Sequence, residues 1–389
     1  MFKIPVSFVI EMDDVGWDDG RDLRLSGKAS RSGIPRNHEP EDYAVLKDLS
    51  DKMGKNLVCA LCLGDWDKDN LLRGEVGITH DPYGWDRASE IDIAKMTKNR
   101  DILESAEHIE YMLHALLHGV YDENGKQLTE HEFYTRSTDS DGNSIPVIIP
   151  EDDFNRRLDL FFKIFDSWGF KKPVKSFVVP NGVRGMSYET VEETTRRLYK
   201  YGIRFWSDSF TFKETVRIIN GVACFKWGKN GFVMPWNAYD MDPSEFGPFV
   251  EEGSEKNSCL LGSHWTNYLR FNPKKNYLNI PRWIAYYERQ SEMFGTALAN
   301  SLAEGVNQLI HYEYAKAEKL DSGDSIDLSD AIALGFDEFE KEFIISLTKD
   351  EIPSSCIGGE ISLYEEKKGF NNYKIKYTDS SIKINILEN

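Results

Sequence analysis

Short apolar runs alternate with amphipathic stretches along the first two thirds of the chain. Runs rich in β-branched and aromatic residues predict strands at residues 6–10, 56–63, 108–113, 175–179, 203–206 and 258–263. Between them, residues 40–53 and 187–201 have the periodicity and start signals of helices. Because strands that alternate with helices are typical of an α/β fold with a largely parallel sheet, we expect a barrel-like sheet.

The pattern changes beyond Pro281. The stretch from Trp283 to Leu320 predicts a long helical region, and a polar link follows at residues 321–330. The later segments KEFIISLT, GEISLYEE, YKIKYTD and SIKINIL alternate polar and apolar residues, as half-exposed antiparallel strands do. We therefore expect a barrel over residues 1–290, a helical connection packed on it over residues 291–324, and a small β-rich accessory domain over residues 325–389.

Composition excludes several classes of protein. The chain has 389 residues, of which 40% are hydrophobic, which is enough for one large core with an appendage. Its net charge of -18 argues against nonspecific binding to nucleic acid, because no overall basic surface exists to displace phosphate counterions. No window approaches the ~18 consecutive apolar residues of a membrane span, and the first residues lack the features of a signal peptide. If Met1 is the natural start, the sequence predicts a cytoplasmic protein.

The closely spaced cysteines Cys59 and Cys62 lie inside the apolar run of NLVCALCLGD. A zinc site made of cysteines would need a second such pair, and a redox site would need the pair to open a helix. We therefore expect buried core thiols.

Candidate chemistry begins with the neighbouring carboxylates Asp13 and Asp14, which follow the first apolar run in SFVIEMDDVGW. In α/β folds, ligands bind where the carboxyl ends of the strands open into loops. His114 and His118, in YMLHALLHGVYD, can reach one cation from a helix face or from a strand-end turn, or they are two unrelated histidines. With Asp14 as third ligand they would bind zinc, or cobalt or manganese, and activate water.

Two further groups would complete hydrolysis. Asp13, beside the proposed cation, could deprotonate the water. His264, in CLLGSHWTN, follows another predicted strand, and its ordinary pKa range suits proton donation to a leaving group. A lone histidine at such a place is more often structural.

The order of the segments EMDDVG, HALLH, VVPNG and LLGSH resembles the successive motifs of the polysaccharide deacetylase, or NodB-like, family of carbohydrate esterases, over roughly residues 6–269. The resemblance implies a distorted β/α barrel whose metal-bound water removes an acetyl group from an acetylated amino sugar or glycan. It also implies site roles, which are base for Asp13, metal ligands for Asp14, His114 and His118, acid for His264, and substrate binding for Pro180 and Asn181.

The motifs also depart from the family pattern. Val15 precedes the glycine of the first motif, and the third motif lacks the arginine that steadies the base, with Asn181 where an aromatic residue is usual. Arg184, in PNGVRG, is a candidate to reach back to Asp13 and a candidate substrate-binding residue. Because the arginine is missing, one alternative is a carbohydrate-binding protein on the same scaffold that no longer catalyses. Another is the hydrolysis of a formamide or a cyclic amide.

Loops after the predicted strands suggest how the substrate could be bound. The segment directly after the acid pair is either a solvated loop or a clamp in which Arg21 and Arg24 bind an anionic part of the substrate. Trp85 and Trp236 lie in aromatic-rich loops and are candidates for stacking on sugar rings, although such side chains are as often local packing anchors.

Overall fold

The computed structural model of the chain describes residues 2–22, 32–138, 142–227, 238–243, 258–320 and 323–388. Two of the predicted substrate-binding residues, Arg24 and Trp236, lie outside these ranges.

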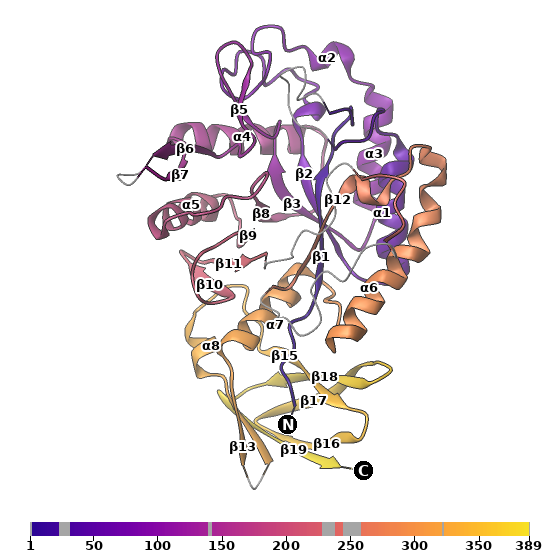
Figure 1. Cartoon of the computed structure of the whole chain (residues 1–389), viewed down its shortest axis with the longest axis vertical. Helices are drawn as coiled ribbons and strands as arrows, with labels where there is room; N and C mark the ends of the chain where they lie inside the picture. The colour runs from indigo at the N-terminus through magenta and orange to yellow at the C-terminus, as the bar shows by residue number, and fades with distance from the viewer. Residues whose placement is uncertain are drawn as a thin grey trace.

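A curled sheet of eight strands forms the centre of the molecule (Figure 1). Its order is β10-β11-β9-β8-β3-β2-β1-β12, and the described pairs are parallel except β10 with β11. The strands are β1 (Val9–Val15), β2 (Leu57–Cys62), β3 (Ile109–Ala115), β8 (Val174–Val178), β9 (Phe205–Asp208), β10 (Val216–Ile219), β11 (Val222–Lys226) and β12 (Leu260–His264). The edge strands β10 and β12 do not pair with each other within the described ranges, so the sheet is a half-barrel. The predicted α/β class is confirmed.

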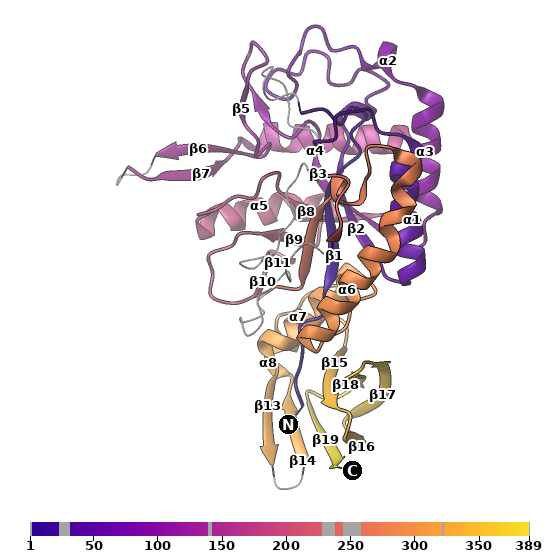
Figure 2. The same ribbon diagram turned by 45° about the vertical axis from the view of Figure 1, so that its right-hand side comes forward.

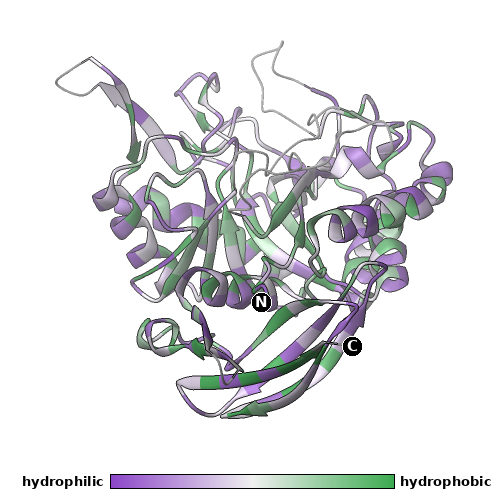
Figure 3. Ribbon diagram, turned by 60° about the horizontal axis from the view of Figure 1, so that its bottom comes forward, coloured by the Kyte–Doolittle hydropathy of each residue, from purple (hydrophilic) through white to green (hydrophobic). Residues whose placement is uncertain are grey.

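Helices cover the outer face of this sheet (Figures 1 and 2). They are α1 (Pro40–Met53), α2 (Arg87–Glu90), α3 (Ile93–Ser105), α4 (Glu151–Ser167), α5 (Tyr188–Lys200) and α6 (Ile280–Phe294), with the 3-10 turns η2 (Gly64–Trp66), η4 (Trp265–Tyr268) and η5 (Pro273–Asn279). One hydrophobic cluster joins alternate strand positions such as Ile10 and Met12 to Leu46 of α1, Phe161 of α4 and Trp283 of α6. Figure 3 shows apolar residues along the sheet and hydrophilic bands on the helices.

Helix α7 (Leu302–Tyr314) fills the amino-terminal end of the half-barrel. Its Val306 and Ile310 belong to a second cluster with inward-facing strand residues such as Val9. Gly305 permits this close packing, because a Cβ at that position would overlap the side chain of Val9. Because apolar packing fills this end, the polar side chains of the interior lie at the carboxyl end of the strands.

Two small antiparallel sheets form the C-terminal part. One has the order β13-β14-β19-β16 and the other β15-β18-β17. Their strands are β13 (Lys316–Leu320), β14 (Gly323–Asp327), β15 (Glu342–Thr348), β16 (Glu351–Ile357), β17 (Gly359–Glu366), β18 (Phe370–Tyr377) and β19 (Ser381–Glu388), with the short helix α8 (Ser329–Ala333). The predicted antiparallel appendage is thus confirmed, while the domain boundaries stay a prediction. The start of the chain reaches this part, since Lys3 pairs with Ser346.

Two short hairpins extend the loops of the large sheet. The first pairs β4 (Val120–Tyr121) with β5 (Gln127–Thr129), and the second pairs β6 (Tyr134–Thr138) with β7 (Ser144–Ile148). The second hairpin projects from the body of the molecule in Figure 2. Neither hairpin was predicted from the sequence.

The long helical region predicted from Trp283 to Leu320 is wrong. It forms two helices, α6 and α7, followed by strand β13. Gly295 ends α6 in the left-handed conformation with a φ of 59°, and Ser301 begins α7 by accepting the Glu304 N–H. The predicted polar link at residues 321–330 also contains a strand, β14, whose apolar Ile326 packs in the core of the small sheets.

The first strand also differs from its prediction at residues 6–10. It runs over Val9–Val15, so the acid pair lies within the strand. The preceding residues bind elsewhere, because the Phe8 N–H donates to the Ala297 carbonyl. Apolar composition located the segment but could not show which of its residues join the sheet.

Gly16 offers a test of how tightly β1 is packed. It has a φ of 120°, and a Cβ there would overlap the carbonyl oxygen of Cys62. We expect Gly16→Ala to lower the free energy of unfolding by about 3 kcal/mol or more, through backbone strain plus overlap. Gly54→Ala is the control, since Gly54 has a φ of 59° with open space around it, and should cost about 1 kcal/mol. Urea denaturation measures both free energies of unfolding. Equal losses in the two variants would contradict the close packing of Gly16 against Cys62.

Candidate metal centre

The proposed ligands Asp14 and His114 lie on the two strands that flank β2, and a bulge interrupts the pairing at each of them. Met12 pairs with Cys59 and Val15 with Leu61, so β1 has one residue more than β2 in this interval. Asp14 lies there with a φ of 67°, which is left-handed backbone. A bulge of this kind bends the strand and redirects a side chain.

The bulge on the other side of β2 singles out His114. Leu113 pairs with Leu61 and Ala115 with Cys62, which leaves His114 as the extra residue of β3. The third ligand, His118, follows in the bend after β3 with a φ of 54°. The pair is therefore displayed by a strand-end turn, which was one of the two arrangements that the sequence left open.

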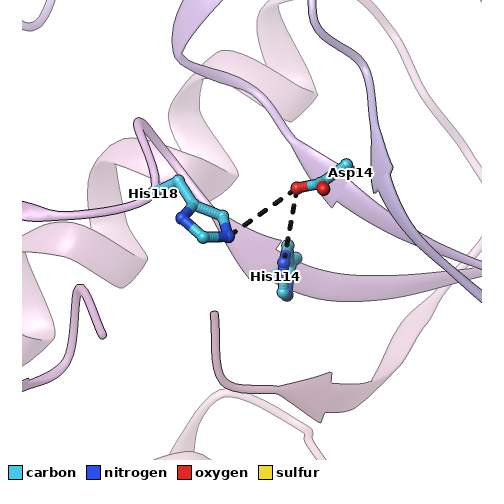
Figure 4. A group of neighbouring side chains, drawn as sticks. All are labelled: Asp14, His114 and His118. Atoms are coloured by element: carbon cyan, nitrogen blue, oxygen red, sulfur yellow. Dashed lines mark ion pairs between the residues drawn. The ribbon is translucent and has the colours of Figure 1, made fainter. Parts of the chain in front are cut away.

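The three side chains converge, as Figure 4 shows. Asp14 Oδ1 lies 3.8 Å from His114 Nε2 and 3.7 Å from His118 Nε2, and the three ligand atoms are all within 4.8 Å of one another. Two ligands about 2.1 Å from a tetrahedral zinc ion stand roughly 3.4 Å apart, so only a small contraction is needed. All three residues are buried. The donor set therefore fits a divalent cation, and Asp14, His114 and His118 are positioned to bind a metal.

The histidines are in the form that binds a metal. Burial lowers the pKa of His114 to about 4, against the opposing effect of the Val178 carbonyl, and burial also holds the pKa of His118 well below its ordinary value. His114 Nδ1 lies 3.0 Å from the Val178 carbonyl oxygen. Because a carbonyl only accepts, Nδ1 carries the proton, and the lone pair of Nε2 points toward Asp14.

The buried thiol of Cys62 touches this centre. Its Sγ lies 4.0 Å from Asp14 Oδ1, where the weak S–H donor can orient the carboxylate. Cys59 and Cys62 are both buried and unbridged, which confirms the prediction of core thiols.

Asp13 and His264 stand side by side next to the ligands, because they pair in register between β1 and β12. Asp13 is 7% exposed, and its Oδ1 is buried without a hydrogen bond to any of the described residues. Burial raises the pKa of Asp13 well above its ordinary value, and the charges of Glu11 and Asp14 add to the effect. His264 is half-buried and close enough to His114 to lower its pKa.

No arginine steadies Asp13 within the described residues. Arg184 is exposed and makes no hydrogen bond or ion pair there, so the prediction that it reaches back to the base is not supported. The loop before it is held instead by Asp208, whose Oδ1 accepts the Val183 N–H at 2.9 Å. Sequence reasoning missed Asp208, although it follows an apolar run in RFWSD, as the other candidate acids do.

Two further buried acids lie below Asp13. Glu11 faces the interior from β1, with Oε2 3.4 Å from the Ser207 hydroxyl of β9, and its Oε1 makes no hydrogen bond within the described part of the chain. Burial raises the pKa of Glu11 to about 8, where the Ser207 hydroxyl lowers it and the charge of Asp208 raises it further. Burial likewise raises the pKa of Asp208 to about 7, against the N–H groups of Val183 and Ser209.

The predicted substrate contacts differ in their surroundings. Pro180 is buried, and its carbonyl accepts from His131 Nδ1 at 3.2 Å. Asn181 is exposed, in left-handed backbone with a φ of 58°. Arg21 is exposed and already bound to Asp19 at 2.8 Å.

The prediction that Trp85 stacks on a sugar is wrong. Its side chain is only 4% exposed, and its ring N–H donates to Asp67 Oδ2 at 2.8 Å. Trp85 is the local packing anchor that was considered as its alternative role.

A second set of polar side chains has the connectivity of a Ser-His-Asp triad. Ser32 Oγ lies 2.6 Å from His38 Nε2, and His38 Nδ1 lies 3.2 Å from Asp42 Oδ2. Ser32 has no exposed surface, so a substrate could not reach its hydroxyl. His38 stacks on Trp265 with 3.8 Å between ring centroids, next to His264. We therefore assign these three residues a structural role, in which His38 packs on Trp265 and holds the segment that follows β12.

No protein-family model and no curated protein matches the sequence. Among solved structures, the chain is similar to a "putative polysaccharide deacetylase from Mycobacterium smegmatis", with 10% identity over 76% of this chain and 87% of that chain and a TM-score of 0.38. These values are too low to support an assignment of function, which therefore depends on the site itself. None of the described helices has the length and apolar character needed to cross a membrane.

Metal analysis tests the centre directly. Protein purified without a metal-affinity tag, soaked in zinc and dialysed should retain about one divalent ion per chain, and His118→Ala should lose it because a ligand is removed. His80→Ala is the control, since His80 packs against Trp85 and Tyr121 outside the three-residue group and its loss should leave the metal content unchanged. Equal metal in all three proteins, measured by elemental analysis, would contradict the assignment.

The raised pKa of Glu11 predicts that the free energy of unfolding depends on pH. An acid whose pKa rises on folding, here from 4.5 to about 8, holds its proton more tightly in the folded protein, so stability falls as the pH rises between these values. In metal-free protein, Glu11→Gln should therefore lose less stability than wild type between about pH 5 and pH 8. Urea denaturation across this range measures it. Glu107→Gln, at an exposed acid, should follow the wild type.

Proposed function

We propose that this protein is a metal-dependent hydrolase that removes an acetyl group from an acetylated amino sugar or glycan, with zinc as the preferred cation. The observation that carries the proposal is the buried Asp14, His114 and His118 group beside the paired side chains of Asp13 and His264. A cation ligated on one side, with a carboxylate and an imidazole next to it, is an arrangement suited to the hydrolysis of an amide.

The ligands and the acid–base pair have separate tasks. Asp14, His114 and His118 would hold a divalent cation, which would make a bound water more acidic and stabilise negative charge on the acyl oxygen. Asp13, in its ionised form, accepts the proton as the water oxygen bonds to the acyl carbon. His264, in its protonated form, then gives a proton to the nitrogen as the carbon–nitrogen bond breaks. Acetate and a free amino sugar result.

Ionisation of Asp13 is the demanding step for this chain. Burial favours its protonated form, and no arginine opposes that effect within the described ranges. A positive charge at the neighbouring Asp14 would favour the carboxylate. We therefore expect activity to depend on the cation in two ways. The cation would keep Asp13 ionised, and it would make the attacking water more acidic.

The burial of Asp13 without a neighbouring arginine in the described residues also favours a second candidate, a carbohydrate-binding protein that does not catalyse. If Asp13 stays protonated, the scaffold could still bind a glycan through exposed groups such as Asn181, Arg184 and Arg21. Such a protein would bind sugars and release no acid with any metal. A third candidate, hydrolysis of a formyl or cyclic amide, uses the same residues on another acyl group.

A substrate panel separates these candidates. Acetylated amino sugars and glycans, with and without an anionic group, should yield acetate from the zinc-loaded protein, whereas their formylated counterparts should yield no formate. Glycan binding without release of either acid would support the binding protein, and formate release would support the third candidate.

Variants of the acid–base pair test the mechanism. Asp13→Asn and His264→Ala should each lower the rate of acetate release by about 100-fold or more, because each removes one proton transfer. Neither is one of the three ligand residues, so metal content should stay at the wild-type level. Full activity in both variants would refute the assigned roles.

A further inference from the structure

The loop that carries His118 has little regular structure of its own. It comprises residues 116–119, between β3 and β4, and His118 lies in it with a φ of 54°. His114 is held by strand β3, whereas His118 is held only by this loop. The loop must therefore keep one conformation if His118 Nε2 is to face Asp14. Something outside the loop has to bind its backbone.

Glu132 binds it. This side chain is fully buried, and its carboxylate accepts the N–H of Leu116 at 2.8 Å, of Leu117 at 3.1 Å and of Gly119 at 3.4 Å. The two carboxylate oxygens thus hold three of the four residues of the loop. Hydrogen bonds from amides to a carboxylate are shorter and stronger than those between neutral groups.

The backbone at Glu132 is itself unusual. Its φ is 30°, a left-handed value that costs free energy in a residue other than glycine. The neighbouring His131 donates from Nδ1 to the Pro180 carbonyl at 3.2 Å, which ties this segment to the loop after β8. A strained backbone at a residue whose side chain binds the loop of His118 indicates a functional constraint.

Two more side chains hold the same loop. Arg157 of α4 lies 3.8 Å from Glu132 Oε1 and donates to the Gly119 carbonyl at 3.3 Å. It supplies the opposite charge that a buried carboxylate needs. Gln127 donates from Nε2 to the carbonyl of His118 at 2.8 Å. The loop is therefore bound through both its N–H groups and its carbonyls.

We propose that Glu132, assisted by Gln127, is a positioning residue of the metal centre, which fixes the loop so that His118 completes the ligand set. The proposal rests on the proposed function, because it assumes a cation between Asp14, His114 and His118. Sequence analysis singled out no role for Glu132, since its partners are backbone groups and leave no pattern of residue types.

The chain offers a matched control in Asp67. Its buried carboxylate accepts the N–H groups of Leu71 and Leu72, both at 2.8 Å, in a loop without a proposed ligand. Asp67→Asn therefore makes the same kind of change as Glu132→Gln away from the metal centre.

The experiment is a titration of the metal-free full-length chain with cobalt(II), followed by visible absorption, with circular dichroism to confirm folding. Glu132→Gln replaces one acceptor oxygen by a donor and should weaken cobalt binding by about 10- to 100-fold, as loss of a group that orients a metal ligand does. Its absorption bands should also change, because His118 no longer holds one geometry. Asp67→Asn should bind cobalt with wild-type affinity and spectrum.

The outcomes are distinguishable. If the wild type binds no cobalt, the proposed function fails. If the wild type binds it and Glu132→Gln has the same affinity and spectrum, the positioning role is overturned while the proposed function stands. Should Glu132→Gln not fold, Gln127→Ala and Glu132→Asp decide, since Gln127 is half-buried and Asp keeps the charge. Wild-type affinity and spectrum in both would overturn the positioning of the loop by these residues. A weakened affinity in Glu132→Asp would support the role of Glu132, and a weakened affinity in Gln127→Ala would support that of Gln127.

Discussion

Parallel strands pair in a fixed register, and a bulge that breaks this register bends the strand and redirects a side chain. The structure breaks the register twice around β2, with one extra residue in β1 at Asp13 and Asp14 and one in β3 at His114. The bulge in β1 is supported by the packing around Gly16. Gly16 lets β1 approach the Cys62 carbonyl, and the Trp66 ring N–H binds the Gly16 carbonyl at 2.6 Å. The convergence of the site thus depends on packing beneath it.

The interior of the half-barrel divides into two environments. At the amino-terminal end, α7 and the strands form a dry apolar cluster. Above it stand Glu11, Asp13 and Asp208, and no lysine or arginine forms an ion pair with them in the described parts of the chain. Burying such groups costs free energy unless they keep their protons or a positive charge comes close. A divalent cation at Asp14 would supply that charge, so the same acids that weaken the metal-free fold favour the metal-bound one.

The sequence predicted the fold class, the small C-terminal sheets and the residues Asp14, His114 and His118, because apolar periodicity and residue type record which strands are buried and which side chains can bind a metal. It did not predict the bulges, since a register shift depends on pairing between distant segments. Glu132 and Asp208 were missed for a related reason, because both bind backbone N–H groups, which every residue except proline has. Trp85 was misassigned because an aromatic side chain in a loop looks the same in sequence whether it is buried or exposed.

The order of the strands along the chain has a consequence for synthesis. The candidate metal ligands lie on β1, on β3 and in the loop directly after β3, and β1, β2 and β3 are the first three strands of the large sheet to leave the ribosome. His264 lies on β12, which pairs with β1 only after most of the chain has been made. A nascent chain therefore contains the three candidate metal ligands long before it contains His264. Under the proposed function, metal binding would precede completion of the acid–base pair, which requires β12 to pair with β1.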